Sequence, residues 1–192
     1  MLIPAVIYIS WDIFFTHIGV WSFNPQFILG FNLVNLPVEE VLFFFVVPYC
    51  CVFIYECVRC YFPLMRDTKA ASLILKGIGV ILFLAGLFFF DRSYTGYTFL
   101  FVGTSIAIFF LLRKYFIHFH VAAFLVSFLI SLVPFLLVNG LLTAMPVVLY
   151  NDNENLGIRI YTIPFEDVFY GMLLLMINIA GFERIRNNNK GV

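Results

Sequence analysis

Six long apolar stretches follow one another along this chain, and each has roughly the length of 20 residues that a helix needs to cross a membrane. Hydrophobic residues make up 63% of the chain, charged residues only 11%, and the mean hydropathy is +1.03. A soluble domain is about 45 to 50% apolar. We therefore predict an all-α polytopic membrane protein with helices at about 2–20, 36–62, 72–91, 97–112, 117–144 and 165–186.

The basic residues predict how these helices are oriented, because cytoplasmic loops of membrane proteins are enriched in Lys and Arg. In a six-helix arrangement all the basic clusters fall on one side, namely Arg59, Arg66 and Lys69; Arg113 and Lys114; and Arg184, Arg186 and Lys190. Both termini are then cytoplasmic, and loops 21–35, 92–96 and 145–164 face outward. A cleaved signal peptide is the alternative for the first stretch, but it lacks a basic start and contains Asp12 and His17.

A Pro-x-Glu-acidic motif occurs twice, at residues 37–40 and 164–167, at an offset of 127 residues (164 minus 37). Further matches at the same offset are Asn24 with Asn151, Gly30 with Gly157, Val41 with Val168, Asp12 with Asn139, Phe23 with Tyr150 and Phe43 with Tyr170. This pattern indicates an internal repeat, and repeats in membrane proteins often share a site at their interface.

The repeat predicts the domain organisation. We assign residues 1–62 to a first repeat, 63–96 to a connecting segment with the third helix, and 97–192 to a second repeat. Two helices precede the second motif within its repeat, whereas only one precedes the first motif. The pattern therefore predicts a bundle that resembles a seven-helix ancestor lacking its first helix, through either a real loss or a misplaced start site.

The motif residues have both a structural and a chemical interpretation. Pro37 and Pro164 are predicted to occupy the first helical position, where the missing N–H costs nothing. The acids that follow then lie in the first turn, where free N–H groups and the helix dipole favour a carboxylate, so helix capping is one explanation. Two adjacent acids repel each other, however, and one of them can then retain a proton for transfer to a substrate. Ionisable groups within membranes favour this functional interpretation.

At these residues the chain resembles the non-flavin lycopene cyclase family, whose membrane proteins occur as bacterial heterodimers and as fused tandem domains in archaea and fungi. The resemblance is carried by Trp11 and Asp12, Gly30 and residues 21–24, 36–44 and 163–171. It implies a redox-neutral, acid-catalysed cyclisation of lycopene end groups to β-rings. An acid protonates the terminal double bond, a neighbouring double bond closes the ring on the resulting cation, and a base removes a proton.

The resemblance implies that the acid and the base are among Glu39, Glu40, Glu166 and Asp167, without deciding which residue donates. Candidate supporting or substrate-binding residues are Asp12, Trp21, Asn24, Phe43, Asn139, Asn151, Arg159 and Tyr170. Asp12 and Asn139 are expected to hydrogen-bond to the site, since polar groups at membrane depth seek partners. Arg159 is expected to pair with a motif acid or with lipid phosphate. The shorter Asp167 predicts that the two motifs are unequal.

No cofactor or metal is expected. The chain has no Gly-x-Gly-x-x-Gly segment for a dinucleotide. His118 and His120 are not accompanied by a carboxylate cluster, and the four cysteines are expected to be reduced packing residues. A retinal Schiff base is disfavoured because no lysine lies in the middle of the last helix.

The expected partners are a carotenoid substrate in the bilayer, the lipid itself, and other carotenoid-biosynthesis enzymes or further copies of the chain, but not nucleic acid. The resemblance places the protein in a bacterial cytoplasmic membrane. The alternatives are an isomerase or hydratase of another polyprenyl chain, a small proton-coupled lipid transporter, and a subunit without catalytic activity.

Overall fold

The computed structural model describes residues 2–65 and 67–188 and contains six α-helices in that part of the chain. Five of them are long and apolar enough to cross a membrane, while the first is shorter, at 16 residues. The all-α polytopic membrane fold is confirmed. The helices are α1 (Leu2–His17), α2 (Val38–Tyr61), α3 (Lys69–Phe88), α4 (Ser93–Leu111), α5 (Val121–Ala144) and α6 (Phe165–Asn188), with a 3-10 turn η1 (Arg113–Tyr115) before α5. Arg66 and Lys190, which support the predicted orientation, lie outside the described residues.

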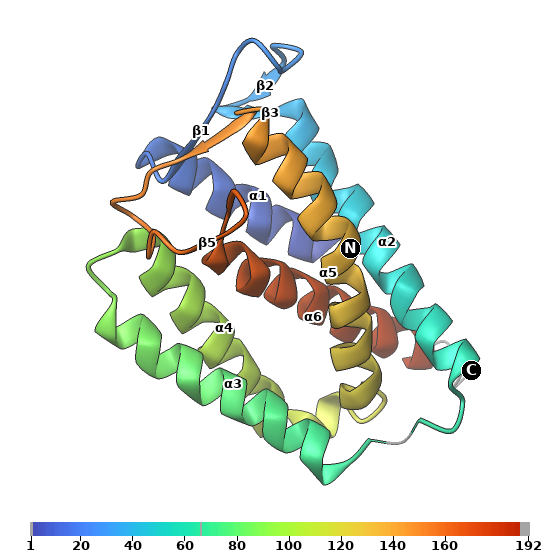
Figure 1. Cartoon of the computed structure of the whole chain (residues 1–192). Coiled ribbons are helices and arrows are strands. Elements are labelled where there is room, and N and C mark those ends of the chain that lie inside the picture. The colour runs from blue at the N-terminus through green and yellow to red at the C-terminus, as the bar shows by residue number, and fades with distance from the viewer. Residues whose placement is uncertain (1, 66, 189–192) are drawn as a thin grey trace.

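The loops between the helices contain short two-stranded ribbons that the sequence did not lead us to expect. The strands are β1 (Trp21–Phe23), β2 (Asn32–Leu33), β3 (Leu36–Pro37), β4 (Val148–Tyr150), β5 (Arg159–Ile160) and β6 (Ile163–Pro164). All three pairs, β1 with β4, β2 with β3 and β5 with β6, are antiparallel. The labelled strands lie at the end of the bundle where α1 ends and α2 and α6 begin (Figure 1).

The prediction that Pro37 and Pro164 are the first helical residues was wrong by one position. Each proline ends a ribbon strand, and the helix begins at the next residue. Pro37 has an extended backbone, with φ −58° and ψ 146°, and is paired with Asn32 across the ribbon. Proline suits this place as well, because a two-residue edge strand tolerates the missing N–H.

The β1–β4 pair joins the two halves of the chain around an approximate two-fold axis. Ser22 lies opposite Leu149, and these residues are 127 positions apart. Next to the pair, the Asn24 N–H donates to the Val147 carbonyl at 2.9 Å, and 127 positions later the Asn151 N–H donates to the Val20 carbonyl at the same distance. The hydrogen bonds of this strand pair thus recur when β1 and β4 are interchanged. The pair brings the starts of α2 and α6 to one end of the molecule.

The loop backbone has the same unusual conformations at the same offset. Gly30 and Gly157 have φ of 83° and 71°, and Val34 and Tyr161 have φ of 62° and 59°. Positive φ is uncommon for residues other than glycine, and it costs most for a β-branched side chain. Its recurrence shows that the two ribbons need the same tight turn before each motif.

At the opposite end of α2 and α6, a ring of four charges joins the two motif helices. Glu56 and Arg59 on α2 stand 127 positions before Glu183 and Arg186 on α6. Each arginine contacts both glutamates: Arg59 lies 3.2 Å from Glu56 and also pairs with Glu183, while Arg186 lies 2.7 Å from Glu56 and 2.8 Å from Glu183. Glu183 is buried, so its charge depends on these partners.

The two halves differ in how the motif helix is covered. In the second half α4 packs on α6 and buries Leu173 and Met176, whose repeat positions in α2, Val46 and Tyr49, are 56% and 64% exposed. Glycines allow α4 in turn to lie close to α3, since a Cβ on Gly103 would come within 2.7 Å of the α3 backbone. The second motif therefore lies in a more enclosed environment than the first.

Replacing Arg59 by Met is expected to lower the stability of the folded protein, because buried Glu183 then loses one of its two cations. The ring is partly exposed, so we expect a loss of about 2 kcal/mol, between the values typical of exposed and of buried ion pairs. Thermal unfolding in detergent measures the change. Arg184→Met is the matched control, since Arg184 is the neighbour of Glu183 on α6 and is not part of the ring; equal loss in both variants contradicts the prediction.

Candidate active site

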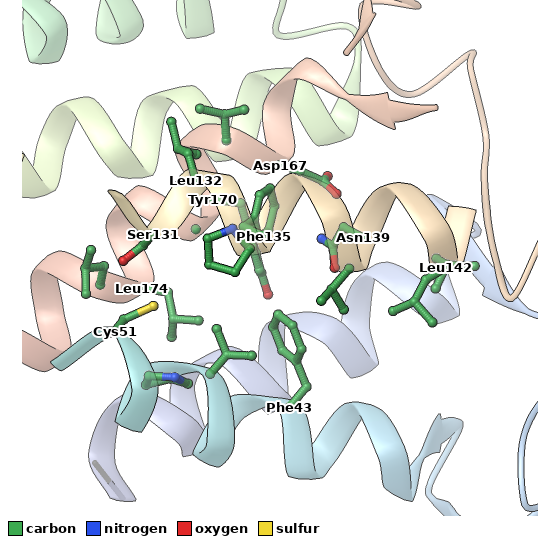
Figure 2. Close-up of a pocket in the computed structure, with 18 of the residues that line it drawn as sticks. Phe43, Cys51, Ser131, Leu132, Phe135, Asn139, Leu142, Asp167, Tyr170 and Leu174 are labelled. Carbon is green, nitrogen blue, oxygen red and sulfur yellow. The ribbon is translucent and has the colours of Figure 1, made fainter. Parts of the chain in front are cut away.

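An elongated pocket of about 300 Å³ lies between α2 and α5 and is closed by α1, α4, α6 and the β1–β4 pair. Figure 2 shows Phe43 of α2 and Asn139 of α5 pointing into the space between their helices, with Cys51 and Ser131 toward one end and Leu142 toward the other. The lining is mostly apolar. Such a cavity, with a few convergent polar groups, is the usual form of a small-molecule site.

The carboxyl groups in this pocket come from both motifs and from α1. Glu40, Asp167 and Asp12 line it, whereas Glu39 and Glu166 do not. Neighbouring residues on a helix point about 100° apart, so only one acid of each adjacent pair can face the cavity. The structure thus separates the four motif acids into two that line the pocket, Glu40 and Asp167, and two that do not.

The first acid of each motif holds the loop that precedes its helix. The Leu29 N–H donates to Glu39 at 2.6 Å, and the Leu156 N–H donates to Glu166 at 2.7 Å, again 127 positions apart. Glu166 also accepts a hydrogen bond from Thr95 of α4 at 2.5 Å. These contacts give the first acids a structural role, but not the predicted one: each carboxylate binds the N–H of a loop residue ten positions earlier and not the free N–H groups of its own helix.

The second acids have unequal surroundings. Tyr94 and Tyr150 donate hydrogen bonds to the two carboxylate oxygens of Asp167, the Tyr150 bond being 2.7 Å long. Within the described part of the chain the Glu40 side chain has no hydrogen bond. The reason is visible in the sequence: Phe23 holds the repeat position of Tyr150 and has no hydroxyl. Asp167 is therefore fixed as an acceptor by two donors, whereas no side chain among the described residues fixes Glu40 in this way.

Asp12 is the third carboxyl group of the pocket, and Tyr170 donates to its Oδ1 atom at 2.9 Å. The Tyr170 ring lies among other aromatic rings, with centroids 4.9 Å from Tyr8, 5.7 Å from Trp11 and 6.4 Å from Trp21. Aromatic faces attract cations within about 6 Å. Carboxylates and aromatic faces together make this end of the pocket suited to a positively charged intermediate.

Tyr150 belongs to strand β4 in the loop between α5 and α6, and burial next to Asp167 raises the pKa of its hydroxyl well above the usual value of 10. The hydroxyl therefore keeps its proton and remains a hydrogen-bond donor at neutral pH. Because this pKa is higher in the folded protein than in the unfolded chain, its contribution to stability is present below about pH 10 and is lost as the pH rises further.

Arg159 does not pair with a motif acid, contrary to one of the two expectations for it. It forms an ion pair with Asp152 and donates to the Thr162 carbonyl at 2.7 Å. The Arg159 side chain lowers the pKa of Asp152, which is largely exposed. The reason is local: the β5–β6 ribbon folds Arg159 back onto its own loop.

The other predicted site residues fall into two groups. Trp21, Phe43, Asn139 and Tyr170 line the pocket, but Asn24 and Asn151 do not. Both asparagines instead accept the N–H two residues later at 3.1 Å and so shape the loops. Asn139 lines the pocket without a hydrogen bond from its side chain to Asp167 or Glu40.

Sequence reasoning missed Tyr94 and Tyr150 as site residues. Tyr150 had a signal, namely its match with aromatic Phe23, but Tyr94, in the first turn of α4, has no position in the sequence to compare with at the 127-residue offset. Pro48, Pro134, Cys50 and Cys51 also line the pocket. Cys50 and Cys51 thus border the cavity in addition to packing within α2, while all four cysteines are free thiols.

Comparison with known proteins supplies the family. A family model described as lycopene cyclase matches residues 1–58 and 91–185. This chain belongs to the lycopene cyclase family. The matched segments contain both motifs and every residue of the carboxylate end of the pocket, and they omit only the connecting segment with α3 and the end of the chain. Searches of curated proteins and of solved structures found no match.

Glu39 and Glu166 accept different numbers of hydrogen bonds, so their removal is expected to lower the stability of the folded protein by different amounts. Glu166→Ala loses two hydrogen bonds at a fully buried position, whereas Glu39→Ala loses one. Hydrogen bonds to charged groups contribute about 1.5 to 3 kcal/mol each, so the Glu166 variant is expected to unfold more easily by about that amount. Thermal unfolding in detergent measures both. Thr95→Val removes only the additional hydrogen bond, so it is expected to lower the free energy of unfolding by most of the difference between the two Ala variants. Equal stability of the two Ala variants contradicts the prediction.

Proposed function

We propose that this protein cyclises end groups of lycopene to β-rings by proton transfer in the pocket between α2 and α5. The observation that carries the proposal is the convergence of Asp12, Glu40 and Asp167 at one end of an otherwise apolar cavity. Membership in the lycopene cyclase family supports the reaction class. A carotenoid is a hydrocarbon, so an apolar cavity within the membrane is the appropriate place to bind it.

Glu40 is the proposed acid. It faces the cavity and has no hydrogen bond that would hold it as an acceptor. Three carboxyl groups close together in an apolar pocket repel one another when all are ionised, which favours keeping one proton among them. Donation of that proton to the terminal double bond of the substrate forms a C–H bond and leaves a tertiary carbocation on the adjacent carbon.

Asp167 is the proposed counter-charge. Two tyrosine hydroxyls donate to it, which stabilises the ionised form and fixes its position. A fixed anion in an apolar site stabilises a developing cation without reorganising as it forms. The aromatic rings of Tyr94, Trp21 and Tyr170 surround the same end of the pocket and contribute their faces to the cation.

The remaining steps conserve atoms and charge. A second double bond of the substrate attacks the cation, closing a six-membered ring and moving the positive charge to a ring carbon. Asp12, one oxygen of which is left free by Tyr170, accepts the proton released as the ring double bond forms. Return of this proton to Glu40 regenerates the site, so the reaction is an isomerisation with no net oxidation.

The same proposal covers placement in the membrane. Arg59, Arg113 and Arg186 belong to the ends of the helices away from the strands, which assigns those ends and both termini to the cytoplasm by the charge rule. The pocket acids, at the starts of α2 and α6, then lie near the outer surface. The products are monocyclic γ-carotene and, after reaction at the second end, β-carotene.

Pigment analysis of lycopene-accumulating bacterial cells that express the chain tests the proposal. The unmodified protein is expected to form cyclic carotenes. Glu40→Gln is expected to lower the rate about 10² to 10⁴-fold, as for loss of a general acid. Glu39→Gln, which keeps a carbonyl oxygen for the Leu29 N–H, is expected to retain most of the activity. Equal losses in these two variants, at equal protein levels in the membrane, contradict the assignment of Glu40.

A hydroxyl added beside Glu40 is expected to impair the acid. Phe23→Tyr places a donor at the repeat position of Tyr150, where it would stabilise ionised Glu40 and weaken proton donation by about tenfold, as one hydrogen bond of about 1.4 kcal/mol would do. Phe27→Tyr in the same loop, at a position that does not line the pocket, is the matched control. The measurement is the rate of cyclic carotene formation, and unchanged activity in Phe23→Tyr contradicts the division of roles.

A further inference from the structure

The pocket is much longer than an end group. Its lining extends along α5 from Phe128 to Thr143 and along α2 from Glu40 to Ile54. At 1.5 Å per helical residue, both lengths correspond to about 20 Å. The carboxyl groups occupy only the end near the strands, and the opposite end is lined by Cys51, Ser131 and aliphatic side chains (Figure 2).

This pocket, called the slot below, opens sideways between α2 and α5. Most of its lining residues are buried or half-buried, but Cys50 on α2 and Pro134 and Val138 on α5 are exposed. Val138 is 55% exposed although it lines the cavity. All three belong to the membrane-crossing parts of their helices, so the surface they face is lipid. The opening therefore connects the slot with the hydrocarbon core of the membrane.

We propose that a linear polyene enters this slot sideways from the lipid, between α2 and α5, and that only one of its ends reaches the carboxyl groups in each binding event. The proposal rests on the cyclase function proposed above. An extended C40 chain is longer than the slot, so its distal half leaves through the opening beside Cys50, Pro134 and Val138. Cyclisation of the second end then requires release and binding in the reverse direction.

Two valines on α5 provide a matched test. Val138 lies on the opening and Val133 does not line the pocket, yet both are exposed, at 55% and 62%. Val138→Trp is expected to obstruct the opening and to lower cyclisation of lycopene about 100-fold, because the end group no longer reaches its reactive position. Val133→Trp faces lipid and is expected to stay within about twofold of the unmodified protein.

Cysteine labelling gives a readout that does not depend on catalysis. Cys50 and Cys60 are both exposed, but only Cys50 borders the slot. Purified protein in detergent is treated with N-ethylmaleimide with and without lycopene, and labelling at each cysteine is measured by mass spectrometry. Lycopene is expected to slow labelling of Cys50, to leave Cys60 unchanged, and to lose its effect on Cys50 in Val138→Trp. Thermal unfolding shows whether Val138→Trp is folded. If it is not, protection of Cys50 by lycopene in the unmodified protein is the result that tests the slot.

The outcomes separate the two proposals. Protection of Cys50 by lycopene supports the slot even when no cyclic product forms, a result that contradicts the proposed function alone. Cyclic products with equal labelling of Cys50 in the presence and absence of lycopene overturn the slot while leaving the cyclase function intact. Activity in Val138→Trp equal to that in Val133→Trp also overturns it.

Discussion

A carboxyl group within an apolar membrane layer needs a hydrogen-bond donor, a counter-charge or a proton, and this requirement organises the structure around α2 and α6. Glu39 and Glu166 meet it with backbone N–H groups, which fixes the loops at the helix starts. Glu183 has two arginines as counter-charges, and these ion pairs join the other ends of the same helices. Glu40 faces the pocket and has no hydrogen bond within the described part of the chain, which is the basis for its proposed role as the acid.

The duplicated elements share a framework but differ in their polar side chains. Main-chain bonds, positive-φ turns and the charge ring recur at the same offset, so both motif helices are held in the same way. Within the pocket the two halves differ in their hydroxyl groups: Tyr150 and Tyr170 stand where the first half has Phe23 and Phe43. Hydroxyl groups are thus concentrated on the second half, which gives one acid donors and leaves the other without them. Such asymmetry lets two similar acids take different roles.

The position of the pocket agrees with the chemistry expected for a lycopene cyclase. A cation generated in water would be captured by it, whereas this cavity is lined mostly by aromatic and aliphatic side chains. The carboxyl groups are gathered at one end of the slot, and the lining of the other end is mostly apolar. This arrangement suits a hydrocarbon that reacts only at its end.

Several features of this protein were determined by the sequence alone, because they depend on local composition. The apolar stretches predicted six helices to within a few residues, and the recurring motif located both acid pairs and placed Asp12, Phe43 and Tyr170 near them. The short ribbons were not predicted, since strands of two or three residues leave no periodic pattern. Tyr94 was not predicted either, because the 127-residue offset gives it no matching position in the sequence.

Only the tertiary structure decided which acid of each pair faces the cavity and which holds a loop. Glu39 and Glu40 are equivalent in type and adjacent in sequence, so no pattern distinguishes them. Their roles follow from the rotation of about 100° between neighbouring helical residues and from what each direction meets. One direction meets the backbone of a distant loop, and the other meets a cavity formed by helices from both halves of the chain.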